Sequence, residues 1–548
     1  MLLQPSLRHH GSLAPPPQLQ PRVHHPGSLE FPSFVVTCSS STSNRSRFRR
    51  HKDTGFGKQP RQTVNWNSVY RKIWLATDMH GDSAAGAEVG AMPGTVAVLN
   101  QCKDQGKHFT KWELFMVVKE LRKTKRFKEA LEVLDWMNNH DHRFRLSSSD
   151  AAIQLDLVAK VYGMSTAEDF FLKLSDKLKD GRVYGALLNC YTHGRMKDKA
   201  ESLMNEMRDK GYASHALPFN VMMTLYMNLG DYDMVEQLVS EMMQKNVQLD
   251  AYSYNIWLSS RGSLDSVEKV EEVFEQMKLD QNITLNWTTF STLATLYIKM
   301  GVTTKAEECL KEIETVISRR DRVAYHYLIS LYGTLGNKEE TYRIWNSYNA
   351  VFPTIPNLGY HAMISSLVRI GDIEGAEKVY EEWLSVRTSF DSRLGNLLMG
   401  FHVKEGNMQK AETIFNQMIE QGGRPNSMTW ETLAEGHIAE RRISEAFSCY
   451  EKAFSVEGSK SWKPKPTNLT SYFQLCQEEG DSSKEEALMG LLRRSGCLND
   501  QLFASLAGLS STSPNISEND QDSQILGSND EADSGGELPM EQLQSSAI

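Results

Sequence analysis

Residues 216–250 read ALPFNVMMTLYMNLGDYDMVEQLVSEMMQKNVQLD, and this stretch decides the fold. From Phe219 to Tyr226 its apolar side chains recur at i, i+3, i+4 and i+7, which is the spacing of one helix face. Gly230 ends this pattern, because glycine accepts the left-handed conformation that commonly closes helices. The apolar residues of 235–242 then repeat the same spacing. The stretch therefore predicts two amphipathic helices joined by a tight turn.

The same pattern returns along the chain about every 35 residues. An aromatic residue recurs at Tyr184, Phe219, Tyr254, Phe290, Tyr325, Tyr360 and Trp430, and a glycine recurs at Gly301, Gly336, Gly371 and Gly406. A fixed period in this range indicates a solenoid, in which stacked neighbours bury the face that one helix pair cannot bury alone. We expect an all-α, right-handed superhelical solenoid of about eleven 35-residue helix-turn-helix repeats over residues 111–500.

Charge divides the 548 residues into parts, although the net charge of the whole is −9. Residues 1–64 hold nine Lys and Arg but two acids, whereas 503–548 hold eight acids and no Lys or Arg. An Arg- and Ser-rich, acid-poor start without an apolar core predicts an organelle targeting presequence over 1–64, mitochondrial first and chloroplast as the alternative, or else a plain basic tail. We expect a linker over 65–110 and an acidic disordered tail over 501–548.

Several classes of protein are disfavoured. The seven cysteines are scattered and form no CxxC, which argues against a disulfide scaffold or a cysteine zinc site. No stretch approaches the ~20 apolar residues that cross a bilayer, so no membrane insertion is expected. A phosphate-binding loop and the zinc motif of nucleobase deaminases are both missing from the sequence. We therefore expect no enzyme, no metal site and no cofactor.

The residues of the deciding stretch resemble the pentatricopeptide repeat. Phe219 to Met223, the turn at Gly230-Asp231 and the second helix from Val235 to Met242 are similar to its usual form VTYNTLI…G…EA…LF..M…G..PD. The segments at 111–114 and 126–132 resemble the plant organellar P-class subgroup. The resemblance implies a protein that binds single-stranded RNA with one base per repeat.

In the family, the fifth residue of a unit and its last residue read the base. Carried over by position, the pairs are Asn220 with Asp250, Asn255 with Asn286, Ser291 with Asp321, His361 with Asp391, and Asn396 with Asn426. Asn with Asp resembles a uridine reader, Asn with Asn a pyrimidine reader, and Ser with Asp a weak guanine reader. His361 with Asp391 departs from the pattern, and Gly185, His326 and Glu431 offer no known code.

Two alternatives remain open from the sequence. Asp250, Asp321, Asp391 and Asn426 each precede a predicted helix, where they suit an N-terminal cap equally well. The first hypothesis is an RNA adaptor in organellar transcript processing, stability, splicing or translation, with RNA-processing or ribosomal proteins as further partners. The second is a protein-interaction solenoid, for example a ribosome-associated scaffold subunit without base readout. The acidic balance and the incomplete code favour the second, because phosphate neutralisation normally supplies much of the affinity for RNA. The aligned Asn positions favour the first.

Overall fold

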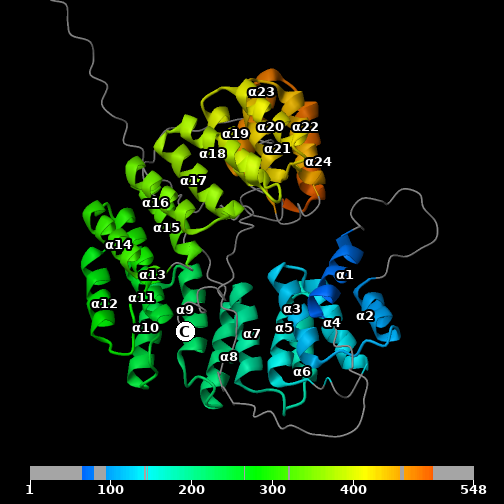
Figure 1. The fold of residues 1–548 in the computed structure, drawn as a ribbon, viewed down its shortest axis with the longest axis vertical. Coiled ribbons are helices and arrows are strands. Elements are labelled where there is room, and N and C mark those ends of the chain that lie inside the picture. Colours follow the sequence, from blue (N-terminus) through cyan, green and yellow to red (C-terminus); the bar gives the residue numbers. More distant parts are fainter. Residues whose placement is uncertain are drawn as a thin grey trace, which may run out of the picture. The chain divides into compact units, whose positions relative to one another are not determined.

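The computed structural model describes residues 65–78, 94–140, 144, 146–264, 266–318, 321–456 and 462–497. In these residues the regular elements are 24 α-helices (Figure 1). The all-α class predicted from the sequence is confirmed. The predicted presequence and acidic tail lie outside the described residues. Within the described part no helix is long and apolar enough to cross a membrane.

The first helices of the units pack against one another in sequence order. From α5 onward each contacts the first helix of the next unit. Their bounds are α3 (Lys111–Lys123), α5 (Ser148–Tyr162), α7 (Gly181–His193), α9 (Ala216–Leu229), α11 (Ala251–Ser263), α13 (Trp287–Lys299), α15 (Arg322–Thr334), α17 (Asn357–Ile370), α19 (Ser392–Lys404), α21 (Ser427–Ala439) and α23 (Pro466–Glu479). The first helices therefore form one continuous layer of the stack.

Each second helix packs against the first helix of its own unit, and most also contact the following first helix. Their bounds are α4 (Phe127–His140), α6 (Met164–Lys173), α8 (Lys197–Asp209), α10 (Tyr232–Gln244), α12 (Val267–Leu279), α14 (Thr303–Val316), α16 (Lys338–Val351), α18 (Ile373–Val386), α20 (Met408–Glu420), α22 (Ile443–Ser455) and α24 (Ser482–Arg494). An alanine recurs at the fourth position of this layer's helices and is fully buried in seven units, at Ala130, Ala167, Ala200, Ala306, Ala376, Ala411 and Ala446. Small residues there let neighbouring helices approach closely.

The unit boundaries follow from helix caps. Gly230 and Gly371 end α9 and α17 in the left-handed conformation, with φ of 71° and 87°. The last residue of each predicted unit from 181–215 to 427–465 is the N-cap of the next first helix, as Asp250 is for α11 and Asn426 is for α21. The periodicity therefore places these boundaries to the residue. The unit predicted at 146–180 is less regular, since α5 begins two residues late, at Ser148.

The predicted linker over 65–110 is wrong for two stretches. Residues 66–78 and 95–104 form α1 (Trp66–Asp78) and α2 (Thr95–Asp104), which pack against α3 and α4 respectively. Ile73 and Leu99 are both fully buried in the core that these helices share with the first unit. This pair covers the end of the stack as a capping unit does. Both helices are short, and the Gly- and Ala-rich residues between them give the stretch the composition of a linker.

Candidate nucleic-acid interface

In two of the five predicted pairs, the structure joins the fifth residue of a unit directly to the last residue of that unit, where the next first helix begins. In the Asn396 seam, formed by Asn396, Asn426 and Thr429, the Asn396 amide donates from Nδ2 to Oδ1 of Asn426 at 3.1 Å. The same Asn426 oxygen accepts the backbone N–H of Thr429 at 2.8 Å, so Asn426 also caps α21. Capping and pairing are therefore properties of one side chain rather than competing explanations of it.

The Asn220 seam has the same design with a carboxylate. It is formed by Asn220, Asp250 and Ser253. Asn220 Nδ2 donates to both oxygens of Asp250, at 3.1 and 3.3 Å, while Asp250 caps α11. Asn220 is only 2% exposed, whereas Asp250 is exposed. The solvent-facing member of this pair is therefore the carboxylate of the last residue.

In the third seam the two predicted residues are joined through a hydroxyl. Asn286 caps α13 and accepts the hydroxyl hydrogen of Thr288 at 2.5 Å. Asn255 donates from Nδ2 to the same Thr288 oxygen at 3.4 Å. Among the described residues, the buried Oδ1 atom of Asn255 has no hydrogen-bond partner. This pair is aligned, but less tightly held than the other two.

The remaining two predicted pairs, all of whose residues the structure describes, are not joined by a side-chain hydrogen bond. The Ser291 hydroxyl donates to the carbonyl of Thr288 in its own helix, and Asp321 accepts from the backbone of Ser318. Asp391 is bound by Arg393 at 2.7 Å.

Charge and burial set the ionisation of the second of these pairs. Burial lowers the pKa of His361, and the nearby Arg393 charge acts in the same direction. Burial by itself raises the pKa of Asp391, but the hydrogen bonds from Arg393 outweigh it, and the net pKa is lower than usual. Burial and the Arg393 charge therefore disfavour the protonated form of the His361 imidazole, while Arg393 favours the ionised form of the Asp391 carboxyl.

Two further fifth positions are closed by internal bonds. His326 hydrogen-bonds through Nε2 to the Tyr348 hydroxyl at 2.8 Å, and burial lowers its pKa to about 4. Glu431 is 1% exposed and accepts from the backbone of Lys465 at 2.6 Å and from the indole of Trp462 at 3.3 Å. Burial raises the pKa of Glu431. These positions serve packing, as their lack of a code suggested.

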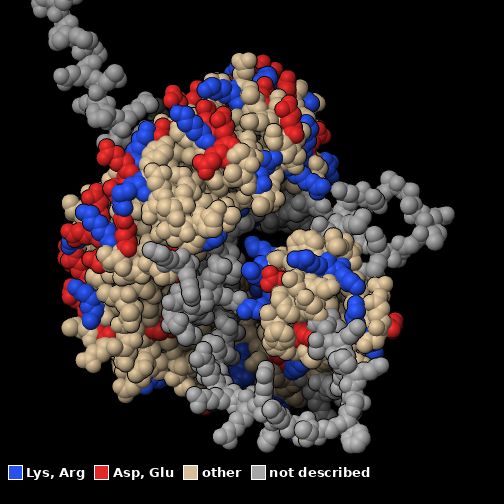
Figure 2. All heavy atoms as spheres, viewed as in Figure 1, with Lys and Arg blue, Asp and Glu red and all other residues tan. Residues whose placement is uncertain are grey.

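Charge is sorted between the two layers. The first helices from α7 to α19 carry no Asp or Glu and seven basic residues, which are Arg182, Arg261, Lys299, Arg322, Arg369, Arg393 and Lys404. The second helices from α8 to α18 carry 21 acidic against 10 basic residues. Figure 2 shows this acidic character over α14, at the left of the view. Between α7 and α19 the excess of negative charge therefore belongs to the second helices.

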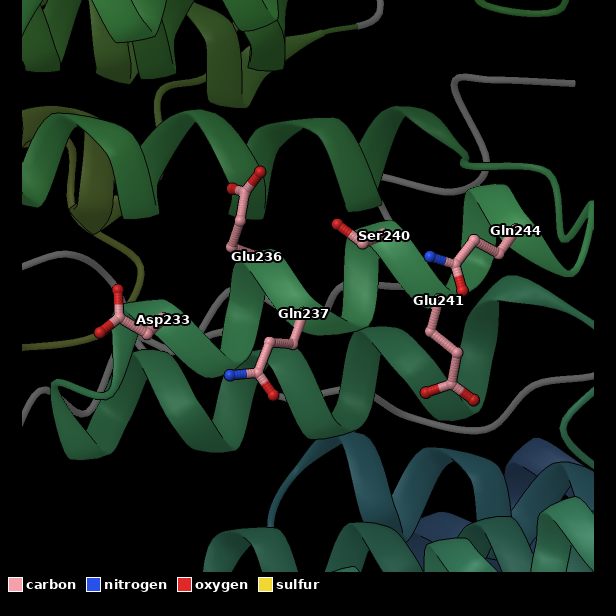
Figure 3. A pocket seen from close by; sticks show the side chains of 6 residues that line it. All are labelled: Asp233, Glu236, Gln237, Ser240, Glu241 and Gln244. Atoms are coloured by element: carbon pink, nitrogen blue, oxygen red, sulfur yellow. The ribbon is translucent and has the colours of Figure 1, made fainter.

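Several cations of the second helices form ion pairs between consecutive units. Arg208 pairs with Glu241 at 2.7 Å and Arg343 with Glu314 at 2.7 Å. A hollow along α10 is lined by Asp233, Glu236, Gln237, Ser240, Glu241 and Gln244 (Figure 3). Its acids Glu236 and Glu241 are bound by basic side chains of neighbouring helices. The acidic lining of this hollow does not suit a phosphate backbone. Two of its carboxylates, Glu236 and Glu241, are already neutralised by arginine side chains.

Comparison with known proteins now decides the family. The PPR repeat family profile matches residues 218–260, and the PPR repeat profile matches 182–212, 252–281, 360–386 and 396–423. The pentatricopeptide repeat-containing protein At1g02150 of Arabidopsis thaliana is 57% identical over 446 residues, which are 81% of this chain and 83% of that protein. The chain belongs to the pentatricopeptide repeat family.

Other similar proteins carry names that refer to different settings, namely the mitochondrion, the ribosome and a complex with RNA. The mitochondrial pentatricopeptide repeat-containing protein At4g21705 of Arabidopsis thaliana is 33% identical over 73% of this chain and 82% of its own. The large ribosomal subunit protein mL101 of the same plant is 34% identical over 72% and 80%. A crystal structure of the pentatricopeptide repeat protein PPR10 with an 18-nt psaJ RNA element aligns with a TM-score of 0.44 at 15% identity, over 81% of this chain and 64% of that chain.

One recurring participant in the pentatricopeptide seams was missed from the sequence, the hydroxyl residue third in the following unit. Ser253 donates to Oδ1 of Asn220 at 2.7 Å, and Thr429 donates to Oδ1 of Asn396 at 2.8 Å. The signal was available, because a Ser or Thr stands at this position after each of the three fifth-position asparagines. From the sequence alone, this Ser or Thr is explained by the capping of its own helix. Only the contact between the two units shows its bond to the preceding asparagine.

Proposed function

We propose that this chain is a single-stranded RNA-binding adaptor whose base readout is concentrated at the Asn220 and Asn396 seams. The observation that carries the proposal is the joining of fifth and last residues at these two seams, with the last residue fixed by its role as helix cap. A fixed polar group presents a defined donor or acceptor, which is what discrimination between base edges requires.

The two seams differ in hydrogen-bond polarity. Asp250 has only acceptor oxygens, which suits the N3–H donor of uracil. The Oδ1 atom of Asn426 is held by the backbone N–H of Thr429, so its remaining polar group is the Nδ2 donor. A donor suits the N3 acceptor of cytosine. We therefore assign uridine to the unit 216–250 and cytidine to the unit 392–426.

The charge arrangement supports a backbone interaction on the same layer. The first helices hold both the paired residues and an excess of cations over acids. Lys299, Arg369 and Lys404 stand at the same place near the ends of α13, α17 and α19, and all three are exposed. Cations in a repeated register can neutralise phosphates along a bound strand, which is the main sequence-independent source of affinity for RNA. The acidic total charge is therefore compatible with RNA binding.

The proposed setting is an organelle, with the mitochondrion first and the chloroplast as the alternative. This proposal rests on the basic start of the sequence and on relatives whose names place them in mitochondria. There the adaptor would act in processing, stability, splicing or translation of a transcript. Its partners would be that transcript and proteins of RNA processing or of the ribosome.

A second candidate function has one specific observation in its favour. A relative at 34% identity over most of both chains is named as a large ribosomal subunit protein. The closed fifth positions at His326 and Glu431 also suit a solenoid that binds protein or structured ribosomal RNA. In that case the seams would be structural only.

Ultraviolet crosslinking in isolated organelles, followed by sequencing of the attached RNA, separates the two candidates. We expect crosslinks to a small set of transcripts, each site containing a uridine and a cytidine in fixed spacing, and sedimentation away from the large ribosomal subunit. Crosslinks confined to ribosomal RNA, with quantitative sedimentation in the large subunit, would establish the scaffold role instead.

A further inference from the structure

We propose that the hydroxyl of the third residue in the following unit, at Ser253 and Thr429, is a positioning residue for base readout. It acts through the fifth-position asparagine of the preceding unit and fixes the orientation of that amide. The inference rests on the proposed function. It adds a third member, contributed by the next unit, to a pair that lies within one unit.

At the Asn396 seam the hydroxyl of Thr429 lies between both amides. It is 2.8 Å from Oδ1 of Asn396 and 2.9 Å from Oδ1 of Asn426. Its oxygen also accepts the backbone N–H of Asn426 at 3.1 Å. Thr429 is 0% exposed, so this hydroxyl cannot exchange these partners for water. With its oxygen held, the Asn396 amide must direct Nδ2 toward Asn426.

At the Asn220 seam the same contacts recur in a different chemical setting. The Ser253 hydroxyl is 2.7 Å from Oδ1 of Asn220 and 2.9 Å from Oδ1 of Asp250. Ser253 is also 0% exposed. A buried hydroxyl with two acceptors in reach strengthens a network in a region of low dielectric constant. The carboxylate of Asp250 is thereby held from two sides while it faces solvent.

The third seam shows what happens when the contact is not made. The Thr289 hydroxyl lies 3.5 Å from Oδ1 of Asn286, and the buried Oδ1 of Asn255 has no partner among the described residues. The unit 251–286 also has one residue more than its neighbours. The third seam therefore has the asparagine and the hydroxyl residue without the hydrogen bond between them. It serves as an internal control for the other two seams.

The type of residue at the third position correlates with the type of residue at the fifth position of the preceding unit. After Asn220, Asn255 and Asn396 it holds a hydroxyl, whereas Gly185, Ser291, His326 and His361 are followed by Pro218, Ala324, Gly359 and Leu394. After the buried Glu431 it holds Asn468, whose amide donates to that carboxylate at 3.4 Å. A cap residue alone would not require this correspondence, since Asp391 caps α19 with Leu394 at the third position.

Thr429→Val tests the proposal in the full chain, because valine keeps the shape of threonine and removes the hydroxyl. The readout is the ratio of affinities for two oligonucleotides that differ only by cytidine or uridine opposite the unit 392–426. We expect the ratio to fall about fivefold, equivalent to about 1 kcal/mol, with Thr429→Ser restoring it. Thr289→Val is the matched control and should leave the ratio at its own unit within twofold.

A purely structural role would lower the melting temperature of Thr429→Val and leave the affinity ratio unchanged, and this result would overturn the inference. Asn426→Asp, measured in parallel, separates this failure from a failure of the proposed function. If Asn426→Asp changes the ratio and Thr429→Val does not, only the positioning role is wrong. If neither changes it, base readout at this seam is wrong as well.

Discussion

Asn396 donates a hydrogen bond of 3.1 Å to Asn426, 30 residues further along the chain, at the point where one repeat ends and the next begins. Asn426 uses the accepting oxygen to cap α21 as well. One bond thus links the start of the repeat to its end and to the first turn of its neighbour. In the proposed function, the same side chain would read a base and keep its structural role as a helix cap.

Exchange of the two cap residues should exchange the preferred bases. Asp250→Asn should move the preference of the unit 216–250 from uridine toward cytidine, and Asn426→Asp should do the reverse in the unit 392–426. Each change should be worth about 1–3 kcal/mol at its own nucleotide. Asp and Asn cap helices about equally well, so thermal stability should change little. Fluorescence anisotropy with RNA variants that differ at one nucleotide measures the base preference of each unit. If neither preference changes, the assignment of bases from hydrogen-bond polarity is wrong.

Replacement of the first-helix cations should weaken RNA binding without altering base preference. Combined substitution of Lys299, Arg369 and Lys404 by Gln should reduce the dependence of log affinity on log salt by roughly 0.7 for each phosphate that is no longer neutralised, as for single strands. Lys305→Gln is the control, because Lys305 lies on α14 in the layer of second helices, where it is paired with Glu271. Equal effects of the control and the first-helix variants would show that the charge segregation is not used.

Glu431 should make stability depend on pH. Burial raises the folded-state pKa of this carboxyl above its unfolded value of about 4.3. Its contribution to stability is therefore complete below that unfolded value and is lost as the pH rises through the folded value. The free energy of unfolding of the wild type, relative to Glu431→Gln, should fall as the pH rises above the unfolded pKa of about 4.3. Denaturant melts across this range test the direction, and an increase would contradict it.

The bond from a recurring tyrosine to the second helix should contribute measurably to stability. Tyr360 donates to Glu382 at 2.9 Å, so Tyr360→Phe should lower the free energy of unfolding by about 1 kcal/mol. Tyr325 holds the same place in its unit and stacks on the ring of Tyr348. Because stacking does not need the hydroxyl, Tyr325→Phe should be close to neutral. An equal decrease in both variants would show that the bond to Glu382 adds nothing.

From residue 181 onward, periodicity sufficed to predict the helix pairs and the unit boundaries, because both depend on local spacing. Tyr184, Phe219 and Tyr254 are at most 5% exposed, as the helical pattern required. The composition led to the wrong prediction of a linker where the helical pattern is short, in α1 and α2. A helix of ten residues next to a Gly- and Ala-rich run has few turns in which to show its period.

The seams could be predicted only in part. The residues Asn396 and Asn426 follow from their positions, but the bond between them depends on how the end of a repeat meets its own first helix. Ser291 and Asp321 have the same spacing and are not joined, since the Ser291 hydroxyl is satisfied by its own helix. The sorting of charge between layers needed the helix assignments, since the sequence average conceals it.

Selection of bound RNA from a random single-stranded pool by the full-length protein tests the central claim most directly. The units 216–250 and 392–426 lie five repeats apart, and one base per repeat places their nucleotides five positions apart. We predict an enriched motif with a uridine and a cytidine at that spacing, and disappearance of each from the motif when Asn220 or Asn396 is replaced by Ala. A pool that stays random, or a motif that both variants leave intact, would contradict base readout at these seams.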